Sequence, residues 1–271
     1  MSLLWQGTLK KMPVQHSQPV GYRLRDAFDS GLELELNPLL GRRLRLKAEG
    51  GLRCVCCGKS TPKFFGEGAC WNCFRSLPQN DICIVRPELC HFHKPDDPCR
   101  DPAWGERHCF QPHFLYMAIS SALKVGITRQ VNVPHRWIDQ GASRAVPVAL
   151  VEDRFSVGRL EKALSAHLND RTNWQRMLKN EVPDLDIESE VSRVIEMIPA
   201  EFVDRVLPER VVHEFEYPSL GWPTKVRSHN LGKSPVLEGT LMAIKGQYLL
   251  FDAGVINIRS HSGHGVILEE L

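Results

Sequence analysis

Hydrophobic and polar residues alternate strictly along two stretches near the N-terminus, residues 32–36 (LELEL) and residues 43–47 (RLRLK). Asparagine, proline and glycine lie between them, so the period-two pattern predicts two strands of a half-buried antiparallel sheet, separated by a turn. Arg43, Arg45 and Lys47 share one face of the second strand. Such a face is consistent with solubility alone or with contact to a nucleic-acid backbone.

A second strand pattern occupies the middle of the chain. Residues 113–119 (HFLYMAI) and 123–128 (LKVGIT) are short apolar runs joined by a small polar turn, which predicts a β-hairpin. Gly126 interrupts the second run and indicates a close approach of backbone or ligand. Residues 132–140 are predicted to form a helix with Asn132 as its N-cap and Pro134 in its first turn. Residues 145–151 are predicted to form a third strand.

The remaining elements complete an α+β fold. Ser156 is expected to cap a helix that runs to about Leu168, and Thr172 to cap a short helix, with Asn173 as an alternative helix-start residue. An acidic helix at residues 187–198 is expected to be an exposed connector. Strand patterns return at residues 211–271, and the N- and C-terminal strands are expected to meet in one β-barrel-like unit. The predicted segments are N-terminal β strands (1–53), a cysteine-rich segment (54–111), a central α/β module (112–180), an acidic helical connector (181–210) and C-terminal β strands (211–271).

The charge is distributed unevenly although the formal net charge is only +2. Residues 112–180 carry ten lysines and arginines against five acidic residues, whereas residues 181–210 carry three against nine. A basic central module is typical of proteins that bind phosphate backbones, so nucleic acid, DNA or RNA, is the expected partner. No apolar run approaches a membrane span and no signal-peptide core is present, so we expect a cytoplasmic protein with no membrane partner.

Nine cysteines lie between Cys54 and Cys109, and in a chain without an export signal they indicate metal ligands before disulfides. Cys54 and Cys57 form one C-x2-C pair, and after twelve residues Cys70 and Cys73 form another. Two such pairs close a tetrahedron around a structural Zn²⁺. Cys56 is left over, although it is able to replace a neighbour.

Residues 81–113 are rich in proline and aspartate and carry little apolar material for a core. We therefore predict a second structural zinc as a staple, with Cys83, Cys90, Cys99 and Cys109 as ligands and His91 as the main alternative. Free buried thiols with scattered histidines are the competing interpretation. The expected cofactor is thus one or two structural zinc ions.

The central module resembles the GIY-YIG nuclease superfamily. Tyr116 stands where the first motif has its tyrosine, and Lys124-Val125-Gly126 stands where the second reads Tyr-Ile-Gly, as in a lysine-bearing branch. Arg136 resembles the arginine of the family, about two residues further from the glycine than usual. Glu161 resembles its metal-binding glutamate, and Asn173 its asparagine. The resemblance implies a GIY-YIG-like fold and a site that binds Mg²⁺ or Mn²⁺, whereas a generic hairpin with a buried tyrosine and a solvated arginine is the alternative.

Over nearly its whole length the chain also resembles a prokaryotic domain-of-unknown-function family, number 2797. The resemblance rests on segments that include PELCHFHKPDDPCRDPAWGERHC and KVGITRQVNVPHRWIDQGA. It implies an architecture, with a zinc ribbon before the central module, and no activity. The sequence therefore predicts a zinc-stabilised, nucleic-acid-binding protein with a metal-dependent endonuclease-type site. A non-catalytic RNA- or DNA-binding or ribonucleoprotein module, and a zinc-stapled protein-interaction scaffold, are the alternatives; the oligomeric state is left open.

Overall fold

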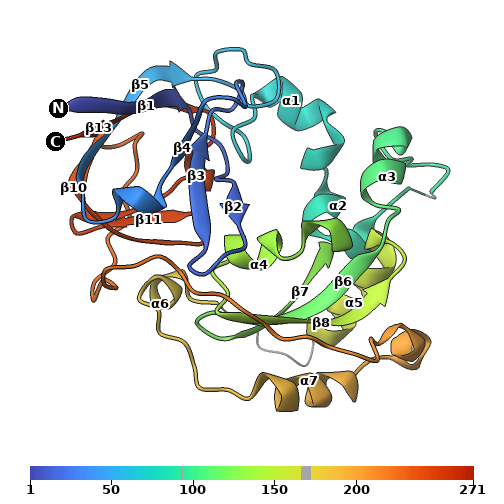
Figure 1. The fold of residues 1–271 in the computed structure, drawn as a ribbon. Coiled ribbons are helices and arrows are strands. Elements are labelled where there is room, and N and C mark those ends of the chain that lie inside the picture. The colour runs from blue at the N-terminus through green and yellow to red at the C-terminus, as the bar shows by residue number, and fades with distance from the viewer. Residues whose placement is uncertain (93, 166–171) are drawn as a thin grey trace. The chain divides into compact units, whose positions relative to one another are not determined.

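A computed structural model describes residues 1–92, 94–165 and 172–271 and confirms the predicted α+β class (Figure 1). The chain forms two compact units. Unit 1 comprises residues 1–74, 138–141 and 215–271, and unit 2 comprises residues 75–137 and 142–214. Within the described residues no helix is both long and apolar enough to cross a bilayer.

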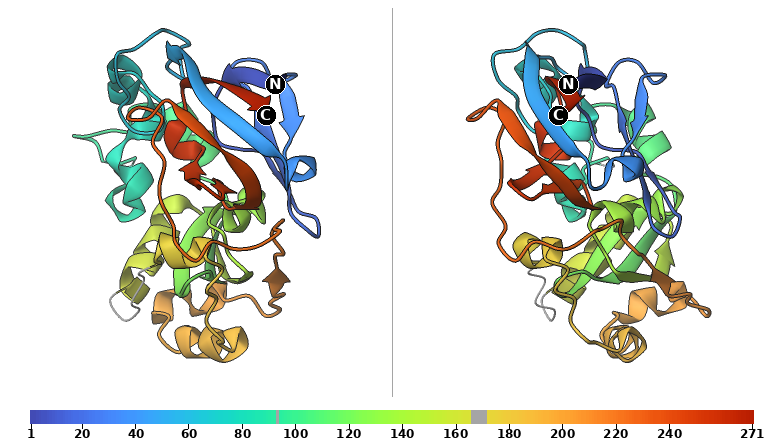
Figure 2. Two further views of the ribbon diagram at one scale, coloured as in Figure 1. Left: turned by 90° about the vertical axis from the view of Figure 1, so that its left-hand side faces the viewer. Right: turned by 60° about the vertical axis from the view of Figure 1, so that its left-hand side comes forward.

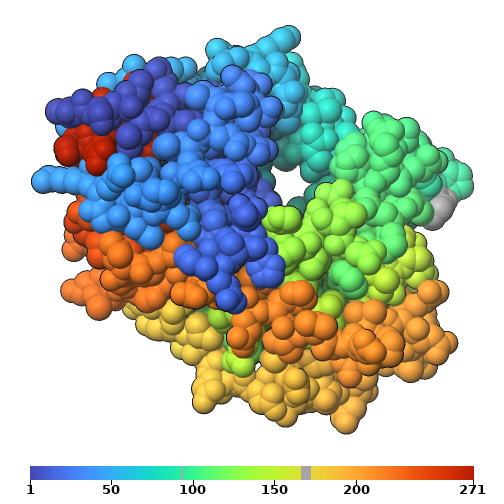
Figure 3. All heavy atoms as spheres, viewed as in Figure 1, coloured from blue at the N-terminus to red at the C-terminus, as the bar shows by residue number. Residues whose placement is uncertain are grey.

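Unit 1 is built on a six-stranded antiparallel sheet that joins the two ends of the chain. Its strand order is β1 (Ser2–Thr8), β13 (His264–Glu270), β5 (Arg43–Leu52), β10 (Val236–Lys245), β11 (Tyr248–Phe251) and β12 (Gly254–Asn257). Trp5 pairs with Leu268, so the N-terminal and C-terminal strands share one sheet, as the sequence predicted. Figure 2 shows β5 beside β10 and β13, and in the space-filling view the blue and red termini lie together (Figure 3).

The alternating stretches form strands, but in different sheets. In β5, Leu44 and Leu46 are buried and the charged residues between them point outward, as predicted. The first stretch instead forms β4 (Glu33–Glu35), which pairs with β3 (Gly21–Arg25) beside β2 (Val14–Gln15) in a separate three-stranded sheet. The prediction of one shared sheet was wrong, because alternation specifies which face of a strand is buried and not which strand pairs with it.

Two of the three basic residues on the charged face of β5 pair with carboxylates, Arg45 on neighbouring strands and Lys47 within β5. Arg45 donates to Glu238 on β10 with an Nε–Oε1 distance of 2.5 Å and also lies 3.6 Å from Glu269 on β13. Lys47 pairs with Glu49 at 2.8 Å. This arrangement favours the solubility interpretation of the face over contact with a nucleic-acid backbone.

Unit 2 contains a four-stranded antiparallel sheet in the order β7 (Leu123–Arg129), β6 (His113–Ile119), β8 (Arg144–Val151) and β9 (His213–Glu214). The predicted hairpin and third strand are confirmed. Leu115 and Met117 on β6 and Val125 on β7 face a core shared with helices α5 (Arg154–Ser165) and α7 (Ile187–Ile195). Because side chains alternate along a strand, Tyr116 and Lys124 point to the opposite face.

Two helix predictions in the central module need correction. Val133 has an extended backbone because a residue before proline avoids the helical region. Asn132 therefore ends a 3-10 turn and does not cap a helix, and helix α4 spans only His135–Asp139. The carboxylate of Asp153, not Ser156, caps α5 by accepting from the Ser156 N–H at 2.7 Å. The expected continuation of this helix to Leu168 falls outside the described residues.

Asn173, not Thr172, caps helix α6 (Trp174–Leu178). The predicted exposed connector is also wrong in one respect, because Ile187, Val191 and Val194 of α7 are buried in the core of unit 2. Its acidic residues lie on the outer side of an amphipathic helix. The other elements are short: α1 (Trp71–Ser76), α2 (Ile82–Val85), α3 (Pro102–His108) and 3-10 helices η1 (Asn37–Leu39), η2 (Pro78–Asn80), η3 (Pro87–Leu89), η4 (Gln130–Asn132), η5 (Ala200–Arg205) and η6 (Arg259–His261).

Candidate metal centre and candidate nuclease-type site

The two C-x2-C pairs converge in unit 1. The sulfur atoms of Cys54, Cys57, Cys70 and Cys73 all lie within 4.8 Å of one another, and those of Cys57 and Cys70 are 3.9 Å apart. Four thiols at this separation match the donor set and geometry of a structural zinc site. Cys56 points to solvent and is outside the group.

Local backbone geometry explains how the first pair is presented. The Gly58 N–H donates to the Cys54 carbonyl at 2.8 Å, and Gly58 takes a left-handed conformation with φ of 73° that glycine adopts without strain. The second pair differs from the tight turn expected, since Cys70 immediately precedes helix α1 and Cys73 lies in its first turn. A spacing of three residues places both thiols on one side of a helical turn as readily as in a loop.

Backbone amides prepare Cys54 to act as a ligand. Burial raises the pKa of its thiol, but N–H donors from Cys70, Cys57 and Cys56 outweigh burial and lower the pKa to about 6. The Cys70 N–H lies 3.2 Å from the Cys54 sulfur. Since zinc binds the thiolate form, this sulfur is poised for a metal at neutral pH.

The loop between the pairs is fastened to the C-terminal strands of unit 1. Glu67 forms a two-pronged ion pair with Arg259 in η6, with nitrogen–oxygen distances of 2.9 and 2.7 Å. The ring of Phe64 packs on His264 with centroids 5.5 Å apart. The metal centre is therefore part of the unit 1 fold and not a detached finger.

The cysteines of the predicted second set lie near one another, since Cys83 interacts electrostatically with Cys90 and Cys109, and Cys109 with Cys90 and Cys99. Cys83 belongs to a buried group with Asp81 and His91, whose ligand atoms lie within 4.8 Å of one another. Cys99 donates to the Asp101 carbonyl at 3.5 Å, and Cys109 follows helix α3. Sequence reasoning named His91 as an alternative ligand but missed Asp81, although it stands two residues before Cys83.

The hairpin brings Tyr116 and Gly126 face to face. They are directly opposed in the β6–β7 register, and a Cβ atom added at Gly126 would lie 2.7 Å from the Tyr116 hydroxyl oxygen. Tyr116 is fully buried, and its ring meets that of Trp137 on α4 edge-on with centroids 5.8 Å apart. A close approach was predicted at Gly126, but the group that approaches is the Tyr116 ring and not backbone or ligand.

The other candidate site residues are divided between two faces of the sheet. Lys124 shares the face of Tyr116, and Arg136 precedes Trp137 on the helix that covers that face. Glu161 lies on α5, which packs on the opposite face. Strand β7 is the edge of the sheet, so the two faces meet along it.

Glu161 lines a cavity of about 240 Å³ beside that edge. Val125 of β7 forms one wall, and Glu88, Arg86 and Lys162 add one further carboxylate and two cations. Carboxylates are oxygen donors of the kind that Mg²⁺ and Mn²⁺ prefer, but Glu161 and Glu88 are not in either of the metal-ligand groups found among the described residues.

Asn173 has a clear structural role. Its side-chain oxygen accepts from the N–H groups of Gln175 and Arg176 at 2.9 and 3.1 Å, and its own N–H donates to the Ser121 hydroxyl at 3.0 Å. Asn173 therefore caps α6 and ties it to the turn of the β6–β7 hairpin.

His113 at the start of β6 is buried and held neutral. Its Nδ1 donates to the Gln111 carbonyl at 2.6 Å, and its Nε2 has no hydrogen-bond partner among the described residues. Burial, with the positive charges of Arg154 and Arg129 as smaller causes, lowers its pKa to about 4. The bond to Gln111 acts in the opposite direction and is outweighed.

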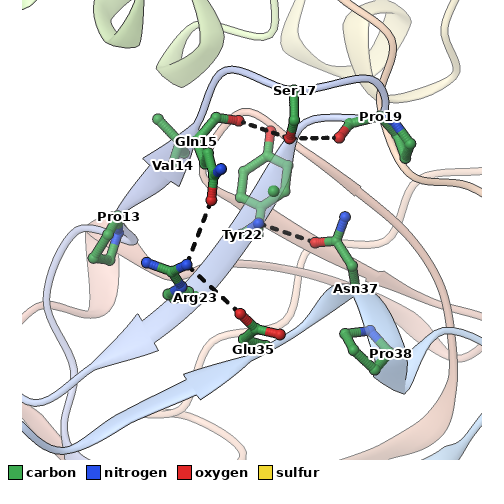
Figure 4. Close-up of a pocket in the computed structure, with 11 residues that line it drawn as sticks. Pro13, Val14, Gln15, Ser17, Pro19, Tyr22, Arg23, Glu35, Asn37 and Pro38 are labelled. Carbon is green, nitrogen blue, oxygen red and sulfur yellow. Dashed lines mark hydrogen bonds and ion pairs between the residues drawn. The ribbon is translucent and has the colours of Figure 1, made fainter.

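A further cavity of about 250 Å³ lies in unit 1 on the small sheet of β2, β3 and β4 (Figure 4). Asn37 accepts from the Tyr22 N–H at 2.9 Å and donates to the Val20 carbonyl at 2.8 Å. Arg23 lies 3.4 Å from Gln15 and 3.6 Å from Glu35. These polar groups hold the sheet together, and the cavity contains none of the predicted site residues.

These features define an α+β protein with a four-cysteine cluster compatible with a structural zinc ion. Residues 41–266 match the family described as "Protein of unknown function (DUF2797)", and the chain belongs to that family. No curated protein and no solved structure matches the chain.

Proposed function

We propose that this protein binds nucleic acid and that the β6–β7 hairpin, with helices α4 and α5, forms a divalent-metal-dependent site for phosphodiester cleavage. The observation that carries the proposal is the cavity at the edge strand β7, where Glu161 and Glu88 lie beside Arg86 and Lys162. Carboxylates next to cations form a combination that suits a metal ion and a phosphate together. The tetracysteine centre has a structural role in this proposal, with Zn²⁺ as its metal.

Each residue of the site has a distinct task. Glu161 supplies the carboxylate ligand, and a bound Mg²⁺ or Mn²⁺ would polarise the phosphate and stabilise the leaving oxygen. Arg136 neutralises charge on the phosphoryl oxygens, because its planar guanidinium binds two oxygens at once. Lys124, at the edge strand, orients the attacking water. Tyr116 supports Lys124 by fixing the register opposite Gly126.

The test is cleavage of labelled single- and double-stranded DNA and RNA by purified protein with Mg²⁺, Mn²⁺ or EDTA. Glu161→Gln keeps the side-chain shape and removes the charge that holds the metal, so cleavage should vanish while binding persists. Glu209→Gln is the matched control, since Glu209 is an exposed carboxylate of the same unit. Equal cleavage by the Glu161→Gln variant and the parent would show that Glu161 is not the metal ligand.

Arg136→Ala should reduce both turnover and binding, with the loss of turnover the larger, because the guanidinium contacts phosphate most strongly in the transition state. Arg107→Ala removes the same charge from an exposed position and controls for general electrostatic attraction. Identical effects of the two substitutions would show that Arg136 contributes only the general attraction of a surface cation.

Non-catalytic nucleic-acid binding is the second candidate, and a specific observation favours it. Tyr116 is fully buried against Trp137 and Asn173 caps a helix, so two of the five family-like positions have structural tasks. The basic composition of residues 112–180 supports binding without chemistry. Binding that weakens steeply with salt, in the absence of cleavage with any metal, is the result that selects this candidate.

A further inference from the structure

A second metal centre is indicated in unit 2, with ligands that differ from the four cysteines predicted there. Asp81, Cys83 and His91 are 7%, 8% and 9% exposed, and one ligand atom from each lies within 4.8 Å of the others. Asp81 caps helix α2 by accepting from the Ile82 N–H at 2.6 Å, which places Cys83 one residue further into that helix. His91 reaches the same point from beyond η3.

Hydrogen bonding fixes which nitrogen of His91 faces the cluster. Its Nδ1 lies 2.7 Å from the Asp97 carbonyl oxygen, and because a carbonyl only accepts, Nδ1 carries the proton. In the neutral ring Nε2 then bears a lone pair, and it lies 3.7 Å from a carboxylate oxygen of Asp81. Metal-binding histidines in proteins typically donate their second nitrogen to a carbonyl or carboxylate in this way.

Two lone-pair donors that face each other in a buried site repel, and a cation between them removes the repulsion; Arg100 already offsets part of the charge on this Asp81 oxygen. A proton on Nε2 would provide one such cation, and a metal ion would provide another. The nearby Cys83 thiol favours the metal, since soft sulfur with imidazole and carboxylate is a donor set typical of zinc. Donors at zinc bond lengths around a tetrahedron are separated by about 3.4 Å, close to the distance between Asp81 and His91.

Charge and orientation also suit a divalent ion. The carboxylate of Asp81 and the thiolate of Cys83 together balance a charge of +2. Arg100 donates from Nε to Asp81 at 2.7 Å and from its terminal nitrogen to the Arg75 carbonyl at 2.5 Å, which holds the carboxylate in place. This is the same Asp81 oxygen that lies 3.7 Å from His91 Nε2, so in the proposed site it would accept from Arg100 and bind the metal at the same time.

We propose that Asp81, Cys83 and His91 bind a structural Zn²⁺, with water in the fourth position, and that this ion ties helix α2 to the chain that follows η3. The proposal does not depend on the proposed nuclease-type site. It assigns no ligand role to Cys90, Cys99 or Cys109, and this difference makes the two ligand sets separable by experiment.

The experiment is zinc analysis of the full-length protein purified without added metal, by mass spectrometry of the metal content. The parent should contain two equivalents, and Cys83→Ser, His91→Gln and Asp81→Asn should each retain one. Asp81→Asn is the key variant for folding, because asparagine caps a helix as well as aspartate and only the charge is lost. Cys90→Ser and Cys99→Ser are the matched controls and should retain two equivalents.

Cobalt substitution provides a second readout. In the Cys57→Ser background the remaining Co²⁺ should show a sulfur-to-metal charge-transfer band about a quarter as strong as a four-thiolate site gives, because one thiolate ligates instead of four. The proposal would be overturned by one zinc equivalent in the parent, or by two zinc equivalents in both His91→Gln and Asp81→Asn. A protonated His91 paired with Asp81 would then be the remaining explanation of the cluster. Loss of an equivalent in Cys90→Ser would overturn the three-residue ligand set.

Discussion

Replacement of Gly126 by alanine should destabilise unit 2, because the added methyl group has no room. The new Cβ atom would lie 2.7 Å from the Tyr116 hydroxyl oxygen, 2.9 Å from its Cζ and 3.3 Å from its Cε1. Carbon does not approach oxygen or carbon that closely without displacement. Tyr116 is fully buried and packed on Trp137, so its ring cannot swing into solvent.

The expected magnitude follows from two opposing effects. Forcing an extra methyl group into a packed site costs about 1–3 kcal/mol. Alanine also restricts the unfolded chain relative to glycine, which returns about 0.4–1 kcal/mol. The net loss is therefore about 1–2 kcal/mol, which corresponds to a fall in Tm of about 2–8 °C for a domain of this size.

Urea denaturation followed by circular dichroism measures this loss, with Gly221→Ala as the matched glycine control. A Cβ atom at Gly221 meets nothing within 4 Å, so that variant should be as stable as the parent or slightly more so. In a Tyr116→Leu background, which removes the hydroxyl, the cost of Gly126→Ala should fall by at least half. If Gly126→Ala proves as harmless as Gly221→Ala, the opposition of Tyr116 and Gly126 across the hairpin is refuted.

Three further predictions concern the metal centre, pH and the acidic helix. Cys57→Ser should remove one zinc equivalent and open residues 54–74 to proteolysis, measured by metal analysis and limited trypsin digestion, because zinc binding contributes folding energy to such a segment. The pKa of His113 is about 4 in the folded protein and about 6.5 in the unfolded chain, so the unfolded chain binds the proton first as the pH falls. The free energy of unfolding should therefore fall by about 2 kcal/mol from pH 8 to pH 5. In urea titrations, His113→Gln should lack that part of the pH dependence. Val191→Asp should cost about 3 kcal/mol or more by leaving a buried charge unpaired, whereas the exposed neighbour Ser192→Asp should cost little; equal effects would contradict the burial of α7.

Local patterns in the sequence predicted the elements well where one periodicity dominates. The β6–β7 hairpin and the face of β5 that carries Leu44 and Leu46 are confirmed, because period-two burial needs no knowledge of the rest of the fold. The partner of β4 was not predictable, since pairing is decided by distant strands. Helix α7 was misread because its three buried residues are sparse among carboxylates, although their spacing of three and four is that of one helix face.

The candidate sites show the same division between local and distant information. Paired C-x2-C spacing was sufficient to predict that Cys54, Cys57, Cys70 and Cys73 come together, since each pair is local. In the second region irregular spacing hid the grouping of Asp81 with Cys83 and His91. Asp81 is both a helix cap and a candidate metal ligand. In the sequence alone, the capping role is enough to explain an aspartate at this position.

Any catalytic mechanism must account for the positions of Glu161 and Arg136 on opposite faces of the sheet. A carboxylate on α5 and an arginine on α4 approach the sheet from opposite faces, so they can act on one phosphate only around the edge strand β7. Edge strands expose unpaired backbone groups and are usually protected by charge or by cover. Here β7 is not covered by another strand of the described chain, and its residue Val125 lines a cavity together with Arg86, Glu88 and Lys162. A phosphodiester passing along that edge would meet cations and carboxylates in turn, which is why the proposed chemistry is assigned to β7 and not to the buried hydroxyl of Tyr116.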